Sequence, residues 1–101
     1  MKTYKIVYTP AAIEHIKEIT LWYNKASKGL GKRFKTNLKA SLKNIKINPF
    51  AHSIRYSNVR FAVPEKFPYA AHYTVDAEKQ TIIIHAVFGF KENPEKWKRN
   101  L

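Results

Sequence analysis

Two histidines occupy outward positions in neighbouring predicted strands. His72 lies in FPYAAHYTVD, residues 67–76, and His85 lies in TIIIHAVFGF, residues 81–90. Both segments alternate in the way that half-buried strands do. A four-residue loop at 77–80 makes the two histidines direct cross-strand neighbours, and a tighter register makes them diagonal neighbours. The alternation in VRFAV predicts that Arg60 joins them on the open face of the sheet.

Two imidazoles and a guanidinium are the groups that metal-independent cleavage of a phosphodiester requires. One group takes the 2′-hydroxyl proton, a second protonates the departing oxygen, and a fixed cation stabilises the charge at phosphorus. The alternative interpretation is that both histidines are tolerated surface residues. His15 and His52 are interpreted as ordinary surface positions. No cluster has metal-ligand spacing and no phosphate-binding loop is found, so neither a metal nor another cofactor is predicted.

The first half of the chain predicts one strand and a helical hairpin. Residues 3–8 alternate as a strand, and Thr9-Pro10 then supplies an N-cap hydroxyl and a proline at the first helical position. NKASKGLG interrupts this first helix, and Asn48-Pro49 ends the second. Because the connection is short, the two helices are expected to pack antiparallel. Their apolar stripes comprise Ala12, Ile16, Ile19 and Tyr23, flanked by Ile13 and Trp22, and then Leu30, Phe34, Leu38, Leu42 and Ile45.

The second half predicts strands. A strand region from about residue 54 precedes the 67–88 hairpin, and Asn93-Pro94 opens a short terminal helix around Trp97. The predicted fold is therefore one α+β domain over residues 1–101, in the order β-α-α-β-β-β, with the helices on one face of a mostly antiparallel sheet. The residues expected beneath the helices are Phe67, Tyr69, Ala71, Tyr73, Val75, Ile82, Ile84, Ala86 and Phe88.

Positive charge dominates the 101 residues. Lysine and arginine number 19 against 7 acidic residues, a formal net charge of +12, and residues 19–64 contain no acid. Such a block attracts nucleic acid or an acidic protein, although a basic surface can also serve solubility alone. The candidate binding residues are Lys32, Lys35, Lys39, Lys43, Arg55 and Lys66. The absence of cysteine, of a signal peptide and of a membrane-length apolar run predicts a cytoplasmic protein that does not contact a membrane.

Several segments in fixed order resemble the RelE/ParE family of type II toxins. They are YTPAAIEHIKEITLWY, GLGKRFKTNLKASLKNIKINP, VRFAVPEKFPYAAHYTVD, IIIHAVFGF and NPEKW, and together they cover nearly the whole chain. The resemblance implies a small basic toxin that is neutralised by a cognate antitoxin wrapped around it. We expect the antitoxin segment, partly helical and partly extended, to cover the basic surface.

The resemblance leaves the mode of action open. RelE-like members cleave mRNA on the ribosome with lysine, arginine and a late tyrosine, whereas ParE-like members poison DNA gyrase. This chain keeps Arg60 in the VR position, but it has Ala70 where relatives carry arginine and has no tyrosine after Tyr73. Lys91 is the cation that remains after the last strand, and with His72 and His85 it completes the candidate catalytic set. A third interpretation is an inactive basic module that binds an antitoxin or nucleic acid.

Overall fold

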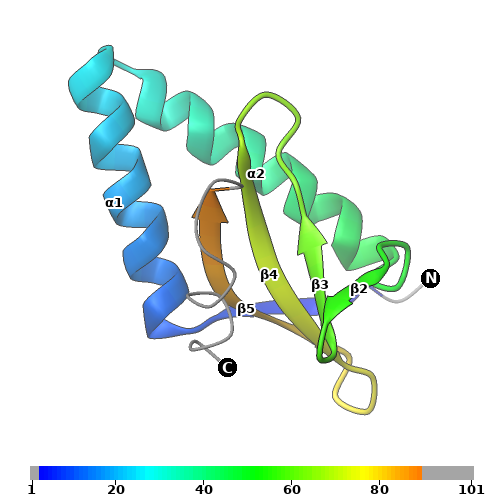
Figure 1. The fold of residues 1–101 in the computed structure, drawn as a ribbon. Coiled ribbons are helices and arrows are strands. Elements are labelled where there is room, and N and C mark those ends of the chain that lie inside the picture. The colour runs from blue at the N-terminus through cyan, green and yellow to red at the C-terminus, as the bar shows by residue number, and fades with distance from the viewer. Residues whose placement is uncertain (1–2, 90–101) are drawn as a thin grey trace.

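Residues 3–89, which this computed structural model describes, form two helices packed on one side of a five-stranded sheet (Figure 1). The elements are β1 (Lys5–Tyr8), α1 (Pro10–Ala26), α2 (Leu30–Ile47), β2 (Ile54–Tyr56), β3 (Val59–Ala62), β4 (Tyr69–Asp76) and β5 (Thr81–Gly89). The predicted α+β class is confirmed, and so is the order of one strand, two helices and then the remaining strands. The predicted C-terminal helix around Trp97 lies outside the described residues.

The start of α1 is fixed by local chemistry, as the sequence predicts. The Thr9 hydroxyl accepts a hydrogen bond from the Ala12 amide at 3.1 Å, and Pro10 takes the first helical position. One helix face packs against the sheet through Ala12 and partly buried Ile16, Ile19 and Tyr23. Two residues expected to flank this stripe, Ile13 and Trp22, are exposed instead.

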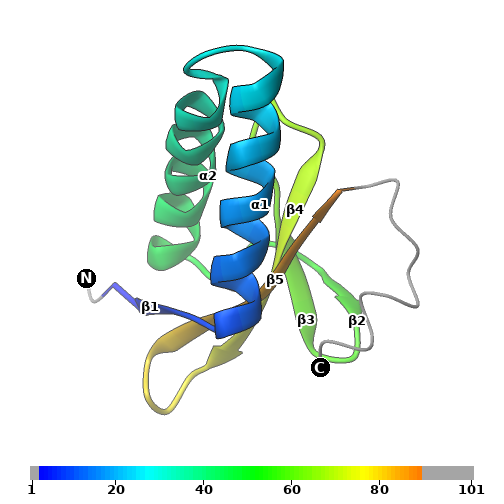
Figure 2. The ribbon, with the colours of Figure 1, turned by 90° about the vertical axis from the view of Figure 1, so that its left-hand side faces the viewer.

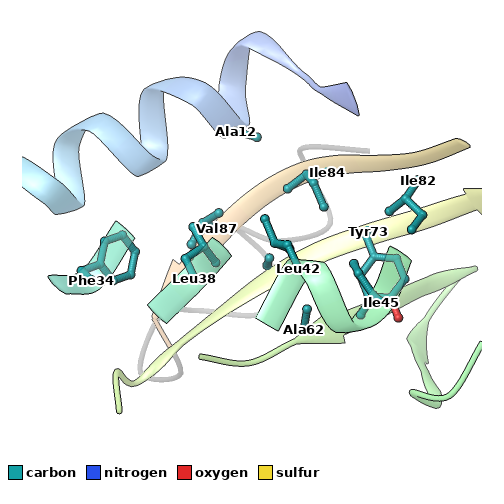
Figure 3. Packing of buried hydrophobic residues seen from close by; sticks show 11 residues of the cluster. Ala12, Phe34, Leu38, Leu42, Ile45, Ala62, Tyr73, Ile82, Ile84 and Val87 are labelled. Atoms are coloured by element: carbon teal, nitrogen blue, oxygen red, sulfur yellow. The ribbon is translucent and has the colours of Figure 1, made fainter. Parts of the chain in front are cut away.

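The helical hairpin closes through two glycines. Gly29 has a φ of 83°, a conformation that suits glycine, and it precedes α2. At Gly31 an added Cβ would lie 2.4 Å from the Thr20 carbonyl oxygen, so the two helices touch backbone to backbone there. The core residues of α2 then point into the layer between helix and sheet: Phe34, Leu38, Leu42 and Ile45 (Figure 3). No helix within residues 3–89 is long and apolar enough to cross a membrane.

The sheet has the order β1-β5-β4-β3-β2 and is mixed, because β1 runs parallel to β5 while the other pairs are antiparallel (Figure 2). The strand region that was predicted from about residue 54 is two short strands. A turn at Ser57, with a φ of 49°, folds β2 back on β3. The sheet is therefore wider by one edge strand than the sequence indicated.

A bulge in the β4–β5 hairpin changes which residues of β5 face the helices. The loop at 77–80 is as predicted, since Asp76 pairs with Thr81. Tyr73 pairs with Ile84, but the next pair is His72 with Ala86, so His85 is an extra residue in β5. Beyond the bulge the alternation is inverted. Val87 belongs to the core beneath the helices, and the prediction that Ala86 and Phe88 lie there is wrong.

Candidate functional site

His72 lies on the side of the sheet away from the helices, as predicted, but it is buried. Its cross-strand partner is Phe61, and only 1% of its surface is exposed. Aromatic rings surround the imidazole, with centroids 4.1 Å away for Phe61, 5.4 Å for Phe88 and 5.7 Å for Tyr56. The Tyr56 hydroxyl is hydrogen-bonded to Nδ1 at 2.9 Å. The imidazole is therefore a core group of the sheet, and the expectation of an outward, solvent-facing histidine is wrong.

Burial makes this imidazole neutral. Desolvation, followed by the nearby charges of His15 and His85, lowers the pKa of His72 from 6.5 to about 4. Burial of the Tyr56 ring likewise raises the pKa of its phenol. At neutral pH the pair is an uncharged hydrogen-bonded unit, which makes His72 a poor proton donor.

His85 occupies the bulge and is held at both its side chain and its backbone. The side chain is hydrogen-bonded through Nε2 to the Thr74 hydroxyl at 2.8 Å. Its carbonyl accepts a hydrogen bond from the Thr9 hydroxyl at 3.0 Å. Burial lowers the pKa of His85 as well. Because the bulge shifts the register, His85 is not the direct cross-strand neighbour of His72 that the loop length predicted.

Arg60 lies on the opposite side of the sheet from His72, so its predicted place on the open face is wrong. Its cross-strand partner is Tyr73, a residue of the core beneath the helices. The guanidinium donates a hydrogen bond to the His52 carbonyl and lies 5.2 Å from the centre of the Phe50 ring. Strand alternation separates adjacent positions, and it is Phe61 that shares a side with His72.

His15 is the residue that sequence reasoning undervalued. It is half-buried between α1 and β5, and its Nδ1 accepts a hydrogen bond from the Val87 amide at 3.2 Å. Its ring packs on Phe88 with the centroids 4.8 Å apart. The interpretation as an ordinary surface position is wrong. The spacing of His15, Ile19 and Trp22, at i, i+4 and i+7, could have indicated a second contact face on α1.

Three lysines line a groove between the two helices. Its floor is apolar and its rim carries Lys17, Lys35 and Lys39, with a volume of about 380 Å³. The floor residues are Tyr8, Ile13, Ile16, Leu38 and Leu42. Lys32 extends the same rim toward the helical turn, beside Thr20 and Asn24. An apolar floor with a cationic rim suits an amphipathic acidic segment.

The remaining predicted binding residues are dispersed. Lys43 is exposed further along α2. Lys66 lines a separate hollow together with Lys32 and Arg33 of α2. Arg55 is on β2, with its guanidinium 5.2 Å from the Phe61 ring centre. The structure thus unites Lys32, Lys35 and Lys39, and it leaves Arg55 on another surface. Lys91 lies outside the described residues.

Metal ligation has no support in the part of the chain described. Residues 3–89 contain no group of three or more histidine, cysteine or acidic side chains arranged to hold an ion.

Comparison with known proteins identifies the family. The sequence model of the ParE toxin of the parDE type II toxin–antitoxin system matches residues 6–94. The chain therefore belongs to the ParE toxin family, which is part of the RelE/ParE group that its motifs resemble. It is a toxin component of a type II toxin–antitoxin system. A search of curated protein sequences finds no match.

Solved structures share the fold. A structure of the chromosomal ParDE system from P. aeruginosa is 16% identical, covers 86% of this chain and 96% of its own, and has a TM-score of 0.74. The isolated E. coli RelE toxin is 19% identical over 97% of this chain and 99% of its own, with a TM-score of 0.67. The RelBE2 complex from Mycobacterium tuberculosis is 16% identical over 91% and 97%, with a TM-score of 0.58.

Proposed function

We propose that this toxin arrests growth in the cytoplasm by binding a protein target, with DNA gyrase the first candidate, and not by cutting mRNA. The observation that carries this proposal is the separation of the candidate catalytic groups. His72 is buried and neutral, while Arg60 points to the other side of the sheet. Cleavage requires an acid, a base and a cation around one phosphate. A binding mode of action needs none of these, only exposed surface.

The mode of action is tested by supplying the purified toxin with each candidate target. We expect gyrase-linked breaks to accumulate in supercoiled DNA, and mRNA in a translating extract to remain intact. His85→Gln is the informative variant, because glutamine can keep a hydrogen bond to Thr74 while removing the titratable ring. It should inhibit growth as the parent does. Ribosome-dependent mRNA cuts that disappear in a folded His85→Gln variant would instead identify a nuclease.

We further propose that the groove between α1 and α2 receives the cognate antitoxin. The similar ParDE and RelBE2 structures come from toxin–antitoxin systems, which supports a protein antitoxin for this chain. The groove combines an apolar floor with lysines on both helices. An acidic amphipathic helix would bury its apolar face on the floor and place its carboxylates at the rim.

The groove assignment predicts a localised electrostatic effect on association. Changing Lys35 and Lys39 together to glutamate should slow antitoxin association by about tenfold or more at low salt, because steering depends on charge near the docking site. The matched control changes Lys5 and Lys79 to glutamate, which alters the net charge equally at two exposed positions outside the groove. Stopped-flow rates across a salt series provide the measurement. Equal slowing by both double variants would contradict the groove assignment.

A further inference from the structure

A second pocket lies on the other flank of α1, in the crease between this helix and the sheet. It has a volume of about 260 Å³ and is lined by His15, Glu18, Ile19, Trp22, Tyr69, Val87 and Phe88. His15, Glu18 and Trp22 recur every three or four residues, so they form one row along the helix. Figure 2 shows α1 crossing over β5, the strand that supplies Val87 and Phe88.

The charge of this pocket is opposite to that of its surroundings. Three further pockets are each lined by three lysine or arginine side chains. Among residues 3–89 the lining of this one contains neither, and the formal charge of that lining comes from Glu18. The chain has 19 basic and 7 acidic residues, so a hollow whose described lining holds a carboxylate and no basic side chain contrasts with these three.

The walls of the pocket are aromatic and firmly held. The Tyr69 ring packs against Tyr23 at 6.0 Å and Phe34 at 5.6 Å. His15 is fixed by its hydrogen bond from the Val87 amide. Trp22 leans edge-on against Tyr23 at 5.1 Å and yet leaves 62% of its surface exposed. A large aromatic ring left mostly in water beside a pocket is typical of an anchoring residue in protein interfaces.

Aromatic faces beside a carboxylate recognise a cation. Indole and phenol rings attract ammonium and guanidinium groups, and the carboxylate adds a charge-assisted hydrogen bond. Guanidinium is favoured because it is planar, stacks on rings and is weakly hydrated. The volume lies below that of most pockets for small organic ligands, which indicates one inserted side chain. Leu21, beside Trp22 and 55% exposed, extends the apolar surface beyond the pocket.

We propose that this pocket binds an arginine side chain of the protein that the toxin targets. The assignment to the target rests on the proposed function, because the antitoxin is placed in the basic groove on the other flank of α1. The two flanks of α1 then serve two partners of opposite charge. The rim lysines attract the acidic antitoxin, and the pocket of Glu18, Trp22 and Tyr69 receives a basic side chain of the target.

Binding of arginine is measured on the purified chain without any assumption about toxicity. Trp97→Phe leaves Trp22 as the single tryptophan, and its fluorescence is followed during titration with N-acetylarginine amide. If that variant does not fold, the tryptophan indole N–H signals of the unmodified chain in NMR spectra give the same readout. We expect saturable binding that is about tenfold weaker for the neutral isostere N-acetylcitrulline amide, because the cation–π and ionic contributions are lost.

Glu18→Gln should weaken arginine binding about threefold or more, since a charge-assisted hydrogen bond becomes a neutral one. Glu14→Gln is the matched control, being exposed on the same helix and outside the pocket. Equal binding of arginine and citrulline, or an effect of Glu14→Gln as large as that of Glu18→Gln, would overturn the pocket's assignment to a cation. The absence of saturable binding would overturn it as well.

The identity of the partner is tested in cells. Trp22→Ala should lose growth inhibition and Glu18→Gln should weaken it, both while keeping antitoxin affinity, and Glu14→Gln should keep both properties. Retained growth inhibition, or a loss of antitoxin affinity, would overturn the assignment of the arginine to the target. If the unmodified chain does not inhibit growth, the proposed function fails, whereas the arginine titration still decides what the pocket binds.

Discussion

Replacing Phe34 with alanine is expected to lower the free energy of unfolding by about 3–5 kcal/mol, the usual cost of truncating a fully buried aromatic residue. Phe34 is 0% exposed and lies at the centre of an aromatic cluster. Its ring centre is 5.4 Å from that of Phe67, 5.6 Å from Tyr69 and 5.7 Å from Tyr23. Truncation therefore removes contacts between α1, α2 and the start of β4 at one point.

The measurement is urea unfolding of the purified variant beside the parent. Thr36→Ala is the matched control on the same helix, because Thr36 is exposed and bonds only the preceding turn through its hydroxyl. It should change stability by less than about 0.5 kcal/mol. A loss below about 1 kcal/mol for Phe34→Ala would mean that the aromatic cluster can collapse into the space, contrary to its packing here.

Phe34→Ala should also affect the arginine pocket. Tyr69 is a wall of that pocket and rests on Phe34 from behind. Loosening the cluster should therefore weaken arginine binding even where the variant remains folded. The helical hairpin and the pocket are thus coupled through the contacts of the Tyr69 ring with Phe34 and Tyr23.

The helices could be predicted from the sequence because their limits are encoded locally. Thr9 and Pro10 cap α1 through a hydrogen bond that joins residues three positions apart, and Asn48-Pro49 ends α2 shortly after its last buried residue, Ile45. The loop at 77–80 is equally local. In each case the residues that fix the end of an element lie next to it in the sequence, so no knowledge of the rest of the fold is required.

The bulge at His85 could not be predicted, because distant residues hold it. Its carbonyl accepts a hydrogen bond from the Thr9 hydroxyl, and the Ile84 carbonyl accepts one from the Thr9 amide. The Val87 amide, just beyond, donates to His15 on α1. These partners are more than 70 positions away, and no glycine marks the bulge. Simple alternation therefore misassigned β5 after residue 84.

The face of Arg60 was misassigned for a different reason. Alternation correctly separated Arg60 from Val59 and Phe61. It could not say which set faces the helices, because both sides of β3 are apolar: Ala62 packs beneath the helices, and Phe61 packs on the other side. A sheet that is buried on both sides offers no polar face to mark the outside.

Acid should destabilise the folded toxin through His72. In the unfolded chain the imidazole has its ordinary pKa of 6.5, whereas burial holds the pKa at about 4 in the folded protein. Between these values the unfolded state binds more protons, so stability falls as the pH falls through this window. The difference between the two pKa values of His72 corresponds to about 3 kcal/mol in the free energy of unfolding, at about 1.4 kcal/mol for each pKa unit. His85, whose pKa is also lowered by burial, acts in the same direction.

His72→Phe isolates this effect, because the ring can still pack on Phe61 and Phe88 but no longer titrates. The variant loses the hydrogen bond with Tyr56 and should be less stable near neutral pH. The further loss of stability of this variant between about pH 7 and pH 4.5 should be markedly smaller than that of the parent. Urea unfolding at both pH values provides the measurement. His52→Gln, in an exposed loop, should keep the parent's full dependence. An undiminished acid loss in His72→Phe would show that this buried imidazole is not the group that acid must charge to unfold the toxin.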